Sequence, residues 1–129
     1  CTPIGEYKFD KILYRRDKLG EINFKIESFD ISQDDGWCDD PNSIYYNQLI
    51  RFPFKESAEH LYRADDIYDI VCVLNYNTSP VVPNKGSAIF LHAAHFDYRR
   101  TAGCIAIKLK TLRTIAEKIV PGSSIIIHS

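Results

Sequence analysis

The sequence contains no methionine, and it begins at Cys1 inside the turn-like stretch CTPIG. We therefore expect a fragment that is preceded by a further segment. No apolar run approaches the about 20 residues that a membrane-spanning helix requires. The first residues, CTPIGEYKFD, show no basic-then-apolar signal pattern. The sequence predicts no membrane span, and localisation cannot be inferred from this N-terminus.

The sequence also lacks an excess of charge of either sign. Lys and Arg number 16 against 17 Asp and Glu, for a net charge of −1. Because no basic run supplies the positive stripe that phosphate backbones require, nucleic acid is not an expected partner. The four cysteines (Cys1, Cys38, Cys72 and Cys104) form no CxxC pair. This spacing predicts neither a structural zinc site nor a dense disulfide framework, and at most one disulfide.

The hydrophobic residues that are present predict strands. A chain of 129 residues with 45% hydrophobic content suits one domain over residues 1–129. Residues 7–14 are rich in aromatic and branched side chains, and Ile22, Phe24 and Ile26 alternate with polar neighbours, which together predict a hairpin with its turn at 17–20.

Two short apolar runs further along, residues 68–74 (YDIVCVL) and 87–91 (SAIFL), predict strands that are buried on both faces. Cys72 lies inside the first run and is expected to be a small buried hydrophobe.

One principal helix is predicted over residues 109–120, with Thr111 as N-cap and Pro121-Gly122 as the stop signal, because apolar residues recur there at helical spacing. A last strand follows at 124–128. The sequence predicts a short helical turn at 57–62 and a polar loop at 31–47. The fold class is therefore expected to be mainly β, a β-rich α+β domain.

Cys104 and His92 are the candidate chemical pair. A thiol attacks only as the thiolate, and its free pKa of about 8.5 must be lowered for reaction at neutral pH. His92 ends the run SAIFLH, Cys104 opens CIAI, and the eleven residues between them allow the chain to fold back. Gly103 allows a sharp turn that leaves backbone N–H groups facing an oxyanion. The residues alone leave open a structural thiol and a hydrogen-bonded core histidine.

No metal or cofactor is expected. His92, His95 and Cys104 resemble a zinc set only weakly, because His95 is poorly directed and no acidic ligand is clearly placed. The acidic cluster at 34–40 lacks the ligand spacing of a calcium loop and predicts a turn. His60 and His128 receive no role.

Several separated motifs resemble one known family. The runs GSAIFLH, TAGCIAI and PGSSIII are similar to the catalytic domain of L,D-transpeptidases of the YkuD type, and TPIGEYKF resembles its entry motif. The stretch DDGWCDDPNSIYYNQLI resembles a proteobacterial branch with TAGC-x-A instead of SHGC-x-R. The resemblance implies a β-rich sheet or sandwich with further upstream strands. It also implies cysteine acyl transfer on peptidoglycan stem peptides and a periplasmic or cell-envelope location.

By this resemblance, Cys104 is the nucleophile and His92 the general base. Thr101 supports the loop, and Gly103 belongs to the oxyanion site together with the Cys104 backbone N–H. The chain departs from the family motif at Ala102 and Ala106, where the family has His and Arg. Arg99 and Arg100 are therefore candidates for recognising a substrate carboxylate, with solvated loop charges as the alternative.

The acidic loop is expected to flank the substrate groove in this family context. Trp37 and Tyr46 are predicted as aromatic walls, and Asp40 or Asn47 as contacts to stem-peptide amines. Three functions stay open at this point. They are a cell-wall transpeptidase, an L,D-carboxypeptidase on the same scaffold and a non-catalytic peptidoglycan-binding module.

Overall fold

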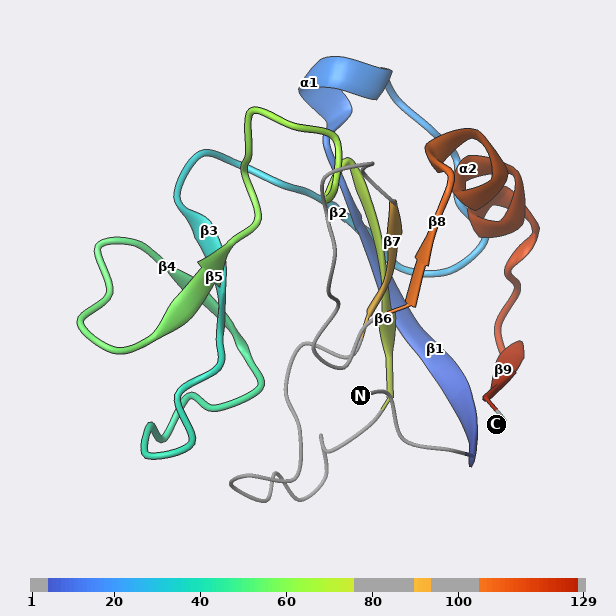
Figure 1. The fold of residues 1–129 in the computed structure, drawn as a ribbon. Coiled ribbons are helices and arrows are strands. Elements are labelled where there is room, and N and C mark those ends of the chain that lie inside the picture. The colour runs from blue at the N-terminus through green and yellow to red at the C-terminus, as the bar shows by residue number, and fades with distance from the viewer. Residues whose placement is uncertain (1–4, 76–89, 94–104, 128–129) are drawn as a thin grey trace.

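The computed structural model describes residues 5–75, 90–93 and 105–127, and the strands in these ranges form two sheets (Figure 1). The six-stranded sheet has the order β2-β1-β6-β7-β8, with β9 paired to β1, and the three-stranded sheet has the order β4-β3-β5. The strands of the large sheet are β1 (Gly5–Tyr14), β2 (Ser28–Asp30), β6 (Ile70–Leu74), β7 (Phe90–Ala93), β8 (Ile105–Ile107) and β9 (Ser124–Ile127). Those of the small sheet are β3 (Asp35–Cys38), β4 (Leu49–Arg51) and β5 (Ala58–His60), and the helices are α1 (Arg16–Leu19) and α2 (Leu109–Lys118). The predicted mainly β fold with one principal helix is confirmed.

Strand β1 organises the large sheet. It pairs antiparallel with β6 through Phe9–Tyr14 and antiparallel with β9 through Gly5–Lys8. The strands predicted at 7–14, 68–74 and 124–128 are therefore confirmed, although His128 lies outside the described residues. β7 overlaps the end of the strand predicted at 87–91, and it pairs antiparallel with β6 and parallel with β8.

The predicted hairpin after β1 is wrong. The chain turns through α1 instead, and β2 pairs parallel to β1, with Ile12 opposite Ser28. Ile22, Phe24 and Ile26 pack into the core from an irregular segment. These three side chains alternate with exposed ones because one face of the segment is buried. A segment can bury one face in this way without pairing in a β-ladder.

Two predictions in the middle of the chain are also wrong. The stretch at 31–47 was expected to be a loop but contains β3, and the helical turn expected at 57–62 is β5. β3 is buried throughout because β4 and β5 pair with its two edges, and this long-range pairing overrides local propensity. Gly36 is required in β3, since a Cβ there would clash with the Phe52 ring and lie 2.9 Å from the backbone carbonyl oxygen of Glu59.

Helix α2 is confirmed near its predicted range, and it ends at Lys118 rather than Val120. The predicted N-cap is wrong, because Lys108 occupies that position and Thr111 lies within the first turn. Gly122 has a φ of 92°, in the left-handed region that favours glycine, and it turns the chain into β9.

The large sheet separates two hydrophobic clusters. Val71 and Val73 of β6 join the small-sheet cluster, whereas Ile70 and Cys72 join the helix cluster under α2. Figure 1 shows the same arrangement, with the small sheet on one side of the large sheet and α2 on the other. Both faces of β6 are thus buried, as its continuous apolar run predicts.

A buried arginine fixes the end of β1 to the loop before β6. Arg15 is 5% exposed. It donates from Nε and Nη2 to the two carboxylate oxygens of Asp17 (2.8 and 2.7 Å) and from Nη1 to the Arg63 carbonyl oxygen (2.8 Å). Its guanidinium carbon lies 3.6 Å from the centroid of the Tyr62 ring. These contacts hold α1 against the segment that leads into β6.

The hydrogen-bonded ion pair of Arg15 and Asp17 predicts that the stability of the fold depends on pH. The hydrogen bonds from Arg15 lower the pKa of Asp17 from 3.8 to about 2. Because the folded-state pKa is the lower one, the stabilising contribution is complete above the unfolded value and is lost as the pH falls from 3.8 towards 2. We expect the difference in unfolding free energy between wild type and Asp17→Asn, measured in urea, to shrink on acidification through this window. A difference that stays constant from pH 6 to pH 2 contradicts the assignment.

Candidate functional site

His92 is the predicted site residue that the structure describes in most detail. It lies in β7, where its backbone is opposite Val71 of β6 on one side and Ala106 of β8 on the other. Its side chain is fully buried. A histidine in the centre of a sheet, rather than in a surface loop, has a fixed position relative to both neighbouring strands.

The His92 ring lies on the small-sheet face, next to an aromatic group formed by Trp37, Tyr68 and Phe90. The ring centroids of His92 and Tyr68 are 5.3 Å apart, with an angle of 70° between the ring planes. Phe90 contacts Tyr68 at 6.1 Å and Trp37 at 5.1 Å, both edge to face. The imidazole is therefore held in a packed apolar setting.

Tyr68 also connects this group to a carboxylate of the small sheet. Its hydroxyl donates to Glu59 Oε2 at 2.9 Å. Burial raises the pKa of Glu59, and the hydrogen bond from Tyr68 opposes that rise. Neither residue stands out in the sequence, because the contact of Glu59 with Tyr68 and that of Tyr68 with His92 join β5, the segment just before β6, and β7 across the fold.

The other half of the predicted pair lies outside the described residues. This applies to Cys104 and Gly103, to Thr101, and to the carboxylate candidates Arg99 and Arg100. His95 of the weak metal alternative lies outside them too. β8 begins at Ile105, directly after Cys104 in the sequence, and Ile105 is paired with Leu91, the neighbour of His92. The roles of these residues stay predictions.

The four predicted groove residues lie in or next to the small sheet. Trp37, Tyr46 and Asn47 are buried, and Trp37 Nε1 donates to Asn47 Oδ1 at 3.1 Å. Asn47 has a φ of 61° and donates its N–H to the Cys38 carbonyl oxygen at 2.9 Å. Asp40 is half-buried and accepts the Asn42 N–H. These contacts shape the loop, and a role in substrate binding stays a prediction.

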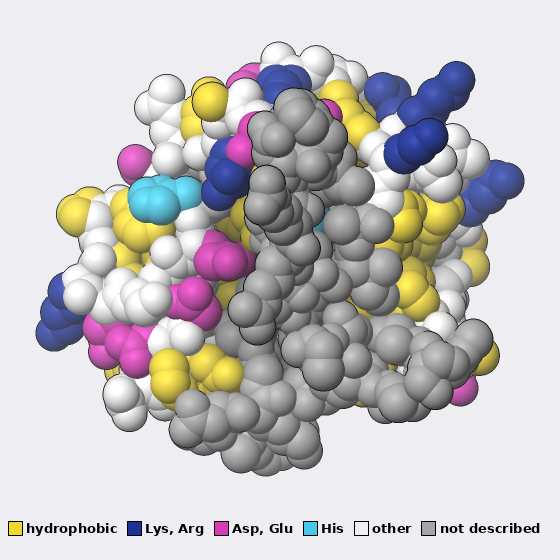
Figure 2. Space-filling view, in the orientation of Figure 1, with side chains coloured by type: hydrophobic (Ala, Val, Ile, Leu, Met, Phe, Trp, Pro, Cys, Tyr) yellow, Lys and Arg dark blue, Asp and Glu magenta, His cyan; other side chains and the backbone are white. Residues whose placement is uncertain are grey.

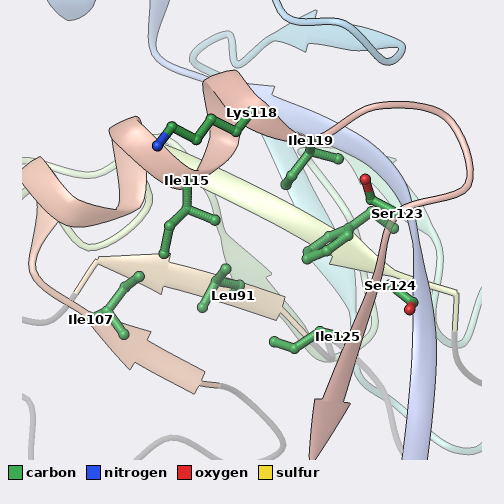
Figure 3. Close-up of a pocket in the computed structure, with 9 residues that line it drawn as sticks. Leu91, Ile107, Ile115, Lys118, Ile119, Ser123, Ser124 and Ile125 are labelled. Carbon is green, nitrogen blue, oxygen red and sulfur yellow. The ribbon is translucent and has the colours of Figure 1, made fainter.

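An apolar pocket of about 450 Å³ lies on the opposite face of the large sheet (Figure 3). Leu91 and Ile107 of the sheet face Ile115 of α2 and Ile119 directly after the helix, and Ile125 of β9 lines one end. Because Leu91 and His92 are consecutive in β7, their side chains point to opposite faces. The pocket is thus separated from His92 by the sheet.

The described surface carries separated groups of charged side chains, and the described residues form no metal-binding group. Figure 2 shows acidic side chains gathered on the side of the small sheet and basic ones towards α2. Within the described ranges, no group of three or more His, Cys, Asp or Glu side chains is arranged to hold a metal ion. No helix in the described parts of the chain has the length and hydropathy for a membrane crossing.

The chain matches a model of one protein family over nearly its whole length. The family model of the YkuD L,D-transpeptidase catalytic domain matches residues 1–127. The chain belongs to the YkuD family. The match includes both strand β7 with His92 and the TAGC motif before β8. YkuD domains act on peptidoglycan and are typically cell-envelope enzymes. No curated protein and no solved structure was found to match the chain.

Two other cysteines of this YkuD domain are buried. Cys72 lies in β6, and Cys38, which was predicted in a polar loop, lies in β3. Desolvation raises the pKa of Cys72 to about 12, so that its thiolate is scarce at neutral pH. A reactive thiol needs an accessible position with positive charge nearby, and the buried position of Cys72 does not provide it.

We therefore expect Cys72 to resist iodoacetamide in the folded protein at pH 7 and to react only after unfolding in urea. Peptide mapping by mass spectrometry measures both states. Cys72→Ala should keep turnover while lowering the unfolding free energy by about 1 kcal/mol or more through the cavity it leaves. Alkylation of Cys72 in the native protein at the rate of a free thiol contradicts its placement.

Proposed function

We propose that this chain is a cysteine acyltransferase that acts on peptidoglycan stem peptides, with Cys104 as nucleophile and His92 as general base. The L,D-transpeptidase family match supports the reaction class. The observation that carries the assignment of residues is the position of His92, fully buried in β7 beside the strand that begins directly after Cys104.

The sheet register supports this pairing. His92 is opposite Ala106 in the parallel ladder between β7 and β8. Ile105, the first residue of β8, follows Cys104 directly in the sequence and is paired with Leu91, the neighbour of His92. The described ladder therefore begins one residue after the proposed nucleophile. A base and a nucleophile must approach to hydrogen-bond distance of about 3 Å, which is the geometry that the proposal requires of His92 and Cys104.

The first half-reaction forms a thioester. His92 takes the thiol proton of Cys104, and the thiolate attacks the carbonyl carbon of the peptide bond that follows the stem's L-centre residue. Backbone N–H groups of Gly103 and Cys104 stabilise the oxyanion, and Thr101 supports their loop. The C–N bond then breaks, and the terminal D-amino acid leaves with the proton returned by the imidazolium. Arg99 or Arg100 is proposed to pair with the carboxylate of this leaving group.

The second half-reaction transfers the acyl group. An amine of another stem peptide attacks the thioester, its proton passes to His92, and the thiol of Cys104 is restored as the new peptide bond forms. Water as acceptor gives a shortened stem instead, which is the carboxypeptidase alternative. The two activities share the acyl-enzyme and differ only in the acceptor.

Incubation with a disaccharide tetrapeptide tests the function, with products identified by mass spectrometry. We expect a cross-linked dimer together with one released D-amino acid for each bond formed. A disaccharide tripeptide without dimer instead identifies the carboxypeptidase. Cys104→Ala is the matched negative control and should yield neither product. An intact substrate after prolonged incubation with the wild-type protein contradicts both activities and favours a binding module.

A further inference from the structure

Glu59, Tyr68 and His92 form a continuous chain of contacts from the small sheet to β7. We infer that Tyr68, anchored by Glu59, is a positioning residue that sets the orientation of the His92 imidazole. The inference rests on the proposed function, in which His92 is the base. It assigns the small sheet a part in the chemistry that neither the sequence motifs nor the family match indicates.

The first link is the contact between the two rings. Tyr68 is 3% exposed and His92 is fully buried, and their planes meet at 70° with centroids 5.3 Å apart. Edge-to-face pairs have a preferred geometry, and neighbours in a close-packed core restrict one another to single rotamers. The Tyr68 ring therefore restricts rotation of the imidazole about its side-chain bonds.

The second link fixes Tyr68 itself at both ends. Its hydroxyl donates to Glu59 Oε2 at 2.9 Å, and its ring packs at 87° against Phe90, two residues before His92 in β7. Glu59 belongs to β5, whose backbone is paired with Trp37 of β3. A shift of the small sheet is thus transmitted to the ring that contacts the base.

Charged groups around Tyr68 favour this arrangement. The guanidinium carbon of Arg63 lies 5.9 Å from the centroid of the Tyr68 ring, and Arg63 is also paired with Asp65 at 2.7 Å. Burial and the charge of Asp39 raise the pKa of Glu59, whereas the Tyr68 hydrogen bond and the positive charge of Arg63 favour its ionised form, which is the stronger acceptor for the tyrosine hydroxyl. Orientation matters because a base must lie within about 3.2 Å of the proton that it removes.

The test compares two replacements of Tyr68 by a spectroscopic and a kinetic measurement. Tyr68→Phe keeps the ring, and Tyr68→Leu removes it. We expect Tyr68→Leu to shift the carbon-bound imidazole proton resonances of His92, which are identified by their loss in His92→Gln. We expect it to slow acylation by a carbapenem about 10-fold or more, as small misplacements of a catalytic group do. Tyr68→Phe keeps the ring but removes the hydrogen bond to Glu59, so it should shift the resonances less than Tyr68→Leu does and keep the rate within about 3-fold of wild type.

Tyr14→Leu is the matched control for the loss of a buried tyrosine. Tyr14 is 5% exposed and packs edge to face against Phe24 at 5.1 Å, in the helix cluster on the other face of the sheet. Tyr14→Leu should lower the unfolding free energy about as much as Tyr68→Leu does, but it should leave the His92 resonances and the acylation rate as they are in the wild type. Glu59→Ala is a second variant that leaves the core intact, because Glu59 is only half-buried. It removes the same hydrogen bond as Tyr68→Phe and should shift the His92 resonances in the same direction and by a similar amount.

Unchanged His92 resonances and a wild-type acylation rate in Tyr68→Leu overturn the inference. If Tyr68→Leu does not fold, unchanged resonances in Glu59→Ala overturn it. The resonances also separate this inference from the proposed function. A wild-type protein that no carbapenem acylates refutes the function of His92 as a base, whereas the comparison of resonances still decides whether Tyr68 orients its ring.

Discussion

Replacing His92 with glutamine is expected to slow acylation of the protein by a carbapenem about 100-fold or more, because the proposed general base is then absent. Glutamine approximates the volume of the imidazole and can form hydrogen bonds, so that it disturbs the fully buried position less than alanine does. The strained ring of the carbapenem stands in for the attacked amide. The increase in protein mass with time, measured by mass spectrometry, gives the rate.

His60→Gln is the matched control for this variant. His60 is exposed in β5 and stacks on Phe52 with ring centroids 3.9 Å apart. Because side chains alternate along a strand, it points to the face of β5 opposite that of its neighbour Glu59. It should acylate at the wild-type rate. Equal rates for His92→Gln and wild type, with both proteins folded by circular dichroism, show that His92 is not the base.

Phe90→Ala is expected to lower the free energy of unfolding by about 3–5 kcal/mol, the usual cost of removing a phenylalanine from a core. Phe90 is fully buried and contacts both Trp37 and Tyr68 edge to face. Single domains are stable by only about 5–15 kcal/mol, so that this variant approaches global unfolding at elevated temperature. Urea denaturation followed by tryptophan fluorescence measures the change, because the chain has one Trp.

Phe29→Ala tests whether this loss comes from burial. Phe29 lies in β2 and is 44% exposed, so that its removal should cost about 1 kcal/mol or less. A loss of stability for Phe90→Ala no larger than that of Phe29→Ala contradicts the assignment of Phe90 to the core between the two sheets.

The elements that could be predicted from the sequence are those with strong local patterns. β6 is a continuous apolar run with both faces buried, and α2 carries its apolar residues at helical spacing. The small sheet could not be predicted, because β3 and β5 have only 4 and 3 residues and are stabilised by each other. The close approach of the Phe52 ring to Gly36, which leaves no room for a Cβ, joins two parts of the chain with no shared motif.

The candidate site likewise contains one residue that the sequence pattern predicts and others that it does not. His92 was predicted as a strand residue near a motif, since its strand is apolar and the motif follows it in the sequence. Tyr68 and Glu59 were not predicted, because neither belongs to a motif. Their contacts with each other and with His92 depend on how the small sheet packs against β6 and β7. Positioning contacts of this kind arise from tertiary packing and leave no local sequence pattern.

Peptide mapping of the carbapenem-treated protein tests the central claim most directly. We predict one adduct for each molecule, located on Cys104 and lost in Cys104→Ala. Cys38 and Cys72, which are buried in β3 and β6, should remain unmodified. An adduct on Cys38 or Cys72, or an adduct that persists in Cys104→Ala, shows that Cys104 is not the nucleophile.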